Sequence, residues 1–152
     1  MRFSKLIITL GILLILAGVV IMYYSQEDSK THICELRVRQ AATAECTWHR
    51  LGETLVWNLD DKEDELLFIK LQEAMLADLQ TAREEEKTSV GLPEYNICIR
   101  ERGERFPFDF KINTGRTTWI ECGGGTYANL GHTQEFLFKH KDKFTPVPAA
   151  AE

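Results

Sequence analysis

The chain opens with an uncharged apolar stretch, Leu6 to Tyr24, and this stretch constrains every other interpretation of the sequence. At a rise of about 1.5 Å per residue, roughly nineteen helical residues span about 28 Å, close to the hydrocarbon thickness of a bilayer. The basic residues Arg2 and Lys5 precede the stretch, and acidic residues follow it. The positive-inside rule therefore predicts a single transmembrane segment with a cytoplasmic amino terminus and an exported body.

A cleaved signal peptide is the alternative interpretation of this opening. Such peptides carry an apolar run of about 7–15 residues followed by a small-x-small cleavage site. The run here is longer, and Met22 to Tyr24 form a poor cleavage site. We therefore expect an uncleaved transmembrane signal anchor over residues 1–24. Gly11 and Gly18 offer a helix–helix contact within it, and the sequence leaves homo-oligomerisation open.

The rest of the chain has the composition of a folded domain with an acidic surface. Hydrophobic residues make up 44% of the sequence and charged residues 27%, so the body can bury a core. The formal net charge is -5, and it becomes about -7 once Arg2 and Lys5 are set aside. This charge disfavours nucleic acid and anionic lipid as partners of the body, and it is compatible with a basic protein partner.

Composition divides the exported part into three regions. Residues 25–31 form a polar linker, residues 32–144 an extracytoplasmic domain, and residues 145–152 a disordered tail rich in proline and alanine. Seven extended linker residues reach at most about 25 Å, so the domain is expected to stay near the bilayer surface.

Apolar and polar residues alternate with a period of two in several stretches of the domain, which predicts strands. The first stretch places Cys34, Leu36 and Val38 on one face, and Ala41–Ala44 then follows as a weak connector. Pro107, near the start of the stretch Phe106–Asn113, favours an edge strand or a strand end there. The expected extended stretches are His32–Gln40, Cys46–Leu59 with a break at Gly52, Tyr95–Arg102, Phe106–Asn113 and, after a turn at Asn113–Gly115, Arg116–Cys122.

One long amphipathic helix is predicted from Asp60 or Asp61 to about Lys87. Asp78 lies in its apolar stripe, and a second apolar group lies on the opposite side. Residues Thr133–Phe144 fit either a helix or a strand. The stripe consists of Leu67, Phe68, Leu71, Ala74, Met75, Leu79 and Ala82, and the opposite group of Leu66, Ile69 and Leu76.

The predicted fold class is therefore α+β. A single N-terminal transmembrane helix is followed by a small antiparallel-sheet domain that carries one long amphipathic helix.

All four cysteines follow the transmembrane segment, so disulfides are expected in an oxidising compartment. Four cysteines allow three pairings. We expect Cys34–Cys46 and Cys98–Cys122 because each pair belongs to one supersecondary unit. The best alternative joins Cys34 to Cys122 and so ties the first predicted strand to the last.

A metal site is weighed against these disulfides and set aside. His32, Cys34, Cys46 and His49 supply ligand types that zinc accepts, but their spacing differs from that of zinc knuckles. The glycines Gly123–Gly125 lack the lysine and hydroxyl residue of a phosphate-binding loop. We predict no catalytic residue, no metal and no cofactor.

Several side chains of the domain are candidates for partner binding. A carboxylate in an apolar stripe must be paired or change its pKa. Asp78 is therefore expected to pair with an arginine such as Arg100 or Arg102, to reach solvent at the edge of the stripe, or to contact a partner. Exposed apolar surface and an edge strand are the other candidate features. The candidate set consists of Leu66, Ile69, Leu76, Asp78, Phe106 and Phe108.

Together these patterns predict a membrane-anchored periplasmic binding domain without catalysis. By analogy with other small tethered domains, it would act as an inhibitor or immunity-type factor, or as an accessory subunit of an envelope complex. The absence of an N-x-[ST] sequon favours a bacterial inner membrane. The alternative is a small metal- or thiol-dependent periplasmic enzyme that uses Cys46, His49 and the Gly123–Gly125 loop.

Overall fold

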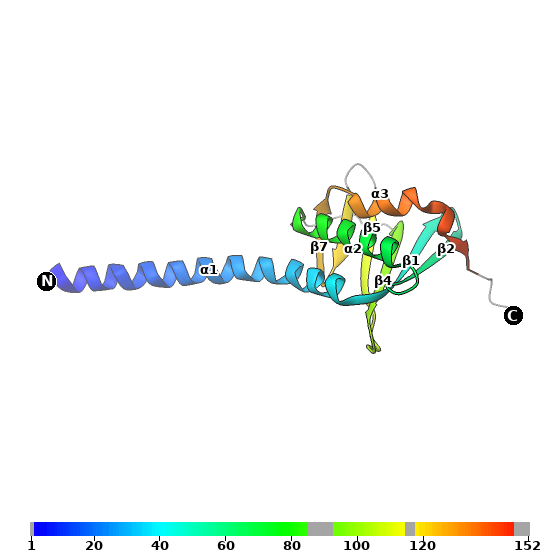
Figure 1. Cartoon of the computed structure of the whole chain (residues 1–152). Helices are drawn as coiled ribbons and strands as arrows, with labels where there is room; N and C mark the ends of the chain where they lie inside the picture. The colour runs from blue at the N-terminus through cyan, green and yellow to red at the C-terminus, as the bar shows by residue number, and fades with distance from the viewer. Residues whose placement is uncertain (1, 85–92, 115–117, 148–152) are drawn as a thin grey trace.

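One long helix, α1 (Arg2–Gln40), carries the chain from its apolar segment into the folded domain (Figure 1). The computed structural model describes residues 2–84, 93–114 and 118–147. Within α1, the 19 residues Lys5–Tyr23 are long and apolar enough to cross a membrane, and none of this window is buried against the domain. The Thr9 hydroxyl donates a hydrogen bond of 2.8 Å to the Lys5 carbonyl, one turn back, so its polarity is satisfied inside the helix.

The helix continues where the sequence predicted a linker and a strand, so both of those predictions are wrong. Cys34 and Val38 are fully buried, whereas Leu36 between them is 46% exposed. Residues four apart share a face both in a helix and in a strand, but the intervening residue shares that face only in a strand. The exposure of Leu36 shows that the helical period applies.

Among the described residues, eight strands form one antiparallel sheet in the order β3-β7-β6-β5-β4-β1-β2-β8. The middle of the sheet is a meander in which neighbouring strands exchange backbone hydrogen bonds. The strands are β1 (Ala41–Arg50), β2 (Glu53–Asp60), β3 (Arg83–Glu84), β4 (Tyr95–Glu101), β5 (Phe108–Asn113), β6 (Thr118–Cys122), β7 (Gly125–Asn129) and β8 (Thr145–Pro146).

Most predicted strands are present with small shifts at their ends. Ala41–Ala44, expected as a connector, is the first part of β1. The predicted break at Gly52 is confirmed as the turn between β1 and β2, where Leu51 and Gly52 both have positive φ, 41° and 85°. The turn predicted after Asn113 falls partly outside the described residues. Thr145 and Pro146, expected in a disordered tail, pair with β2, while residues 148–152 lie outside the described residues.

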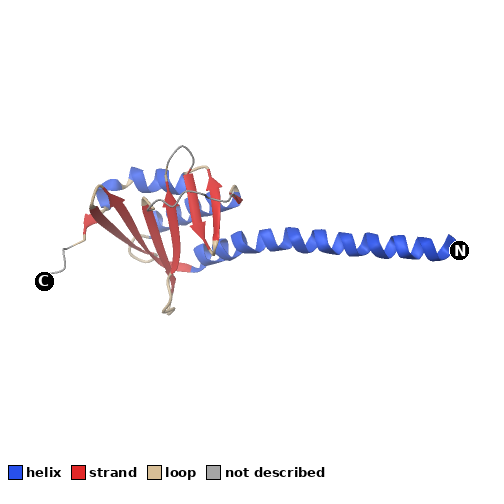
Figure 2. Cartoon of the chain, turned by 180° about the vertical axis from the view of Figure 1, so that it is seen from behind, coloured by secondary structure: helices blue, strands red, loops and turns tan. Residues whose placement is uncertain are grey.

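Helices cover one face of the sheet and leave the other open (Figures 1 and 2). The predicted amphipathic helix is present as α2 (Glu65–Gln80), but it is shorter than expected at both ends. The sequence allowed either a helix or a strand for residues Thr133–Phe144. The structure has helix α3 (His132–Lys139) and the short 3-10 helix η1 (Lys141–Lys143) there. The fold is thus a two-layer α+β arrangement.

The core lies between the sheet and its helices. One side of α2 packs on the inward residues of the central strands, and an aromatic group closes the core near the end of the chain. In that group the Trp48 and Tyr95 rings stack with centroids 5.8 Å apart, and Phe144 meets Trp57 edge-on at 5.7 Å. The α2 and strand core includes Phe68, Leu71, Met75, Leu79, Ile97, Ile99, Phe110, Ile112 and Ile120.

A disulfide between Cys34 of α1 and Cys122 of β6 fastens the long helix to the sheet. This is the pairing given above as the alternative, and the pairs Cys34–Cys46 and Cys98–Cys122 are wrong. Cys46 lies opposite Ile97 in the ladder, so the next residue, Cys98, points to the other face of the sheet. Cys46 and Cys98 are therefore free thiols that cannot pair with each other.

Two polar contacts reinforce this attachment. Gln72 of α2 donates a hydrogen bond of 2.8 Å to the Val38 carbonyl. The Arg37 guanidinium lies 2.9 Å from the Glu101 carboxylate and also approaches the Phe108 ring. The last turns of α1 thus belong to the folded domain.

We predict that replacing both Cys34 and Cys122 by serine lowers the free energy of unfolding by about 2–5 kcal/mol. The bond closes a loop between residues 88 apart in sequence, which restricts the unfolded chain. Denaturant unfolding of the full chain in detergent measures the change. Cys98→Ser is the matched control and should leave the stability unchanged within about 0.5 kcal/mol. Equal stability of the double variant and the control would contradict the role given to the disulfide.

Candidate functional site

The open face of the sheet presents a row of polar side chains across its central strands. In the ladder, Glu45 of β1 lies between Asn58 of β2 and Cys98 of β4, and Cys98 in turn lies opposite Asp109 of β5. Because side chains alternate along a strand, all four point away from the helices. Figure 2 shows no helix over this face.

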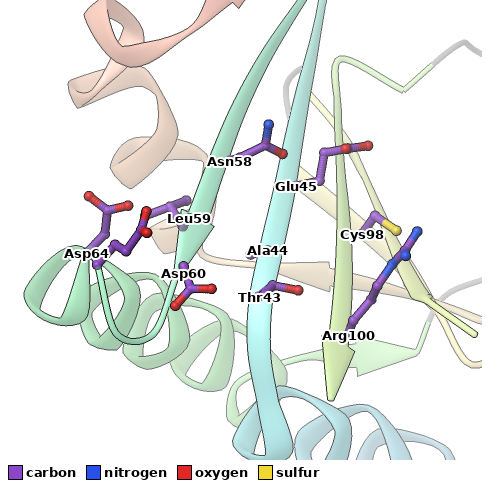
Figure 3. A pocket seen from close by; sticks show the side chains of 10 residues that line it. Thr43, Ala44, Glu45, Asn58, Leu59, Asp60, Asp64, Cys98 and Arg100 are labelled. Carbon is purple, nitrogen blue, oxygen red and sulfur yellow. The ribbon is translucent and has the colours of Figure 1, made fainter. Parts of the chain in front are cut away.

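A hollow of about 350 Å³ lies at one side of this row (Figure 3). Three neighbouring strands form its floor, and the segment that leads from β2 into α2 forms its wall. Charged side chains gather in this hollow. Its lining residues are Thr43, Ala44, Glu45, Asn58, Leu59, Asp60, Glu63, Asp64, Cys98 and Arg100.

The hollow is strongly acidic, because four carboxylates line it against the single guanidinium of Arg100. Asp60 holds the turn that follows β2: its carboxylate accepts a hydrogen bond of 2.8 Å from the Lys62 N–H, and its carbonyl accepts one of 2.9 Å from the Asp64 N–H. These two hydrogen bonds fix the backbone of the wall and the carboxylate of Asp60.

The free thiol of Cys98 opens onto this hollow and is kept protonated. Partial burial raises the pKa of the Cys98 thiol, and the charge of Asp109 and a hydrogen bond with it raise the pKa further, against a smaller opposite effect of Arg100. Burial, together with the charge of Glu45, also raises the pKa of the Cys46 thiol. Neither cysteine is therefore an activated nucleophile.

Asp78, which stood out in the sequence as a carboxylate within an apolar stripe, is bound by backbone N–H groups and not by an arginine. Its carboxylate is 1% exposed and accepts hydrogen bonds from the backbone N–H groups of His132 (2.9 Å) and Thr133 (2.8 Å). These are the first N–H groups of α3, which has no capping side chain of its own because Gly131 precedes it. Asp78 thus caps α3 from α2, and the expected pairing with Arg100 or Arg102 is wrong; Arg102 pairs instead with Asp61 at 2.8 Å.

The other predicted partner-binding residues differ in exposure. Leu66 and Ile69 on α2 are 67% and 41% exposed, whereas Leu76 packs against the core. Phe106 is 81% exposed in the connection between β4 and β5, and Phe108 packs against the core. That connection projects from the sheet away from α2 (Figure 1), so the two exposed groups lie on different sides of the domain.

The residues of the alternative enzyme do not meet. Cys46 is fully buried on the inner face, while His49, three residues on, points to the open face at the end of β1. Gly123–Gly125 belong to the turn between β6 and β7, separated from β1 by β5 and β4. Cys34 is occupied by its disulfide, and no group of three or more His, Cys, Asp or Glu side chains in the described ranges is placed to hold a metal ion.

Reasoning from the sequence missed the hollow. Glu45 is remote in the sequence from Asp60, Glu63 and Asp64, and only the β1–β2 pairing brings it beside them. One signal was present: Thr43, Glu45 and Thr47 alternate with apolar residues, but the stretch was split between a connector and a strand.

Comparisons with known proteins add nothing to this geometry, since no family model, no curated protein and no solved structure matches the chain. The site is therefore interpreted from its own residues.

We predict that Asp78→Ala destabilises the protein by about 1–3 kcal/mol, because two backbone N–H groups of α3 lose their acceptor inside the fold. Thermal or denaturant unfolding of the full chain measures the loss. Glu73→Ala, at an exposed position of the same helix, is the matched control and should change stability by less than about 0.5 kcal/mol. If the two variants unfold alike, the capping role is wrong.

A second prediction concerns thiol reactivity. Maleimide should label Cys98 of the folded protein slowly at pH 7, and the rate should keep rising above pH 9, the ordinary pKa, because the raised pKa delays formation of the thiolate. Cys46 should stay unlabelled until the protein is unfolded. Mass spectrometry over pH 7–10, with a guanidinium-denatured sample as control, measures both. Rapid labelling at pH 7, or labelling of native Cys46, contradicts the assignment.

Proposed function

We propose that this protein is a single-pass protein of the bacterial inner membrane whose periplasmic domain binds a basic protein partner and does not act as a catalyst. The acidic hollow on the open sheet face is the observation that carries the proposal.

The topology rests on three features. The helical stretch Lys5–Tyr23 is long and apolar enough to span a bilayer, and Arg2 and Lys5 lie at its amino end. The disulfide between Cys34 and Cys122 indicates that the domain folds in an oxidising compartment. A cytoplasmic amino terminus and a periplasmic domain satisfy all three features.

Binding at the hollow is supported by its charge and its accessibility. An antiparallel sheet commonly leaves one polar face to solvent. Here four carboxylates gather around one arginine, and opposite charge on a partner would guide the encounter and fix its orientation. A partner with exposed lysine or arginine side chains fits this surface.

The stem limits where that partner can be. The eleven residues that follow Tyr23, up to the disulfide-bonded Cys34, are helical and span about 17 Å. The partner must therefore lie in the membrane or come close to it. An inhibitor or immunity-type factor acting on an envelope-directed protein, or an accessory subunit of an envelope complex, meets this condition.

The proposal is tested by photo-crosslinking in living cells. A photo-reactive amino acid in place of Thr43, on the floor of the hollow, should capture a discrete partner, and Glu45→Lys should lower the yield at least tenfold because it reverses a charge of the hollow. Glu121→Lys makes the same change on the same face outside the hollow and should leave the yield unchanged. Mass spectrometry identifies the captured chain.

Two results would contradict the proposal. One is the absence of any crosslink that depends on the hollow. The other is an equal loss of yield in both lysine variants, since that would reflect the net charge of the domain and not a site.

A further inference from the structure

Leu51 lies at the tip of the β1–β2 hairpin in a conformation that disfavours leucine. The turn consists of Leu51 and Gly52, and φ is positive at both residues, 41° and 85°. Such two-residue turns favour asparagine, aspartate or glycine, because larger side chains are strained at positive φ. The Leu51 side chain is 97% exposed, so the described part of the fold offers almost no packing that offsets this strain. A strained and exposed apolar residue indicates a contact outside the fold.

A second depression, of about 440 Å³, lies beside Leu51, and we call it the distal depression. His49 is paired with Thr54 across the hairpin, and the His49 N–H donates a hydrogen bond of 2.8 Å to the Glu94 carbonyl. Because side chains alternate along each strand, His49 and Thr54 point to the open face of the sheet. Leu51 and Pro93 supply apolar surface. The distal depression therefore offers an apolar contact on the same face as the acidic hollow.

The hollow and the distal depression lie at opposite ends of one strand. Thr43 of β1 lines the hollow, and His49 of the same strand lines the depression. At about 3.3 Å per residue, these two residues are about 20 Å apart. Between them Thr47 is paired with Val56 on one side and with Asn96 on the other, so this row of three strands carries no charge. An extended segment can follow β1 from one site to the other.

We propose that the basic partner of this domain presents an extended segment of about seven residues along β1. Lysine or arginine at one end of the segment occupies the acidic hollow, and an apolar side chain at the other end packs against Leu51 and Pro93. This inference rests on the proposed function and specifies the segment that the partner uses. Charge pairing in the hollow orients the segment, and burial of the apolar side chain adds a contact that charge alone does not supply.

The position and the charge of this surface disfavour two other occupants. Figure 1 shows the end of the β1–β2 hairpin on the side of the domain opposite the apolar stretch of α1, so Leu51 lies far from a bilayer crossed by that stretch. A second copy of this chain would bring its own acidic surface to the hollow, and like charges in an interface are unfavourable. A segment with basic charge at one end and an apolar side chain at the other suits both sites.

The probe is a capped heptapeptide with lysine at positions 1 and 3, leucine at position 7 and threonine elsewhere. Odd positions of an extended chain share a face, so the lysines reach the hollow when the leucine reaches the distal depression. The peptide is titrated at low salt onto the full chain in phosphatidylcholine nanodiscs. The reversed sequence is titrated as well, because the geometry admits either chain direction, and the tighter of the two is used below.

A pair of variants tests the role of Leu51. Leu51→Asn removes the apolar side chain and introduces a residue that tolerates positive φ. It should weaken binding of the heptapeptide at least fivefold and raise the unfolding temperature of the full chain by about 2–4 °C. Leu130→Asn is the matched control, since Leu130 is 71% exposed after β7, which three strands separate from β1. It should change binding less than twofold.

A second peptide tests the spacing without altering the protein. It has the same direction and composition, but leucine is at position 6 and threonine at position 7. The leucine then points away from the sheet when the lysines occupy the hollow, so binding should be at least fivefold weaker than that of the first peptide.

The outcomes separate this inference from the proposed function. If Glu45→Lys abolishes binding while Leu51→Asn and the displaced leucine have no effect, the hollow binds basic segments and the apolar contact at Leu51 is wrong. If Glu45→Lys has no effect either, both proposals are wrong. A lower unfolding temperature of Leu51→Asn would show that the side chain supports the fold, and this would overturn the inference. Absence of peptide binding, or self-association lost in Leu51→Asn, would also overturn it, while crosslinking from Thr43 still tests the proposed function.

Discussion

The disulfide between Cys34 and Cys122 is the contact on which the geometry of this protein most depends, because it joins the long N-terminal helix to the sheet. Around it, Val38 is buried in the core, Gln72 binds the Val38 carbonyl, and Arg37 pairs with Glu101. Without these contacts the last turns of α1 would be a free stem. With them, the last turns of α1 pack against the sheet as part of the folded domain, and the same helix continues into the apolar stretch Lys5–Tyr23.

This attachment determines what the domain presents and where. The helix places the Cys34–Cys122 disulfide about 17 Å from the end of the apolar stretch at Tyr23. Helices α2 and α3 occupy one face of the sheet. The opposite face is left to solvent and carries the acidic hollow. A tethered domain searches little volume, so a modest local attraction can suffice for recognition of a partner in the same membrane.

Individual elements show how far the sequence can be trusted. The alternating phenylalanines before Asn113 predicted β5, and the apolar stripe around Leu71 predicted α2, because their periods fit one structure only. The stretch with Cys34 and Val38 failed, since a spacing of four fits a helix and a strand equally. Asp78 was recognised as anomalous, but its partners are backbone groups of a helix 54 residues away, which no local pattern can reveal. The hollow was missed for the same reason.

The sequence alone determined the apolar stretch, the acidic character of the body, the position of all four cysteines after that stretch and the α+β class, because each depends on composition, order or local periodicity. The tertiary structure decided which cysteines pair, which carboxylate caps α3 and which acidic side chains share a hollow. These depend on contacts between residues far apart in the chain, and strand order and register set such contacts. A sequence records them only indirectly, through a pattern that many arrangements can satisfy.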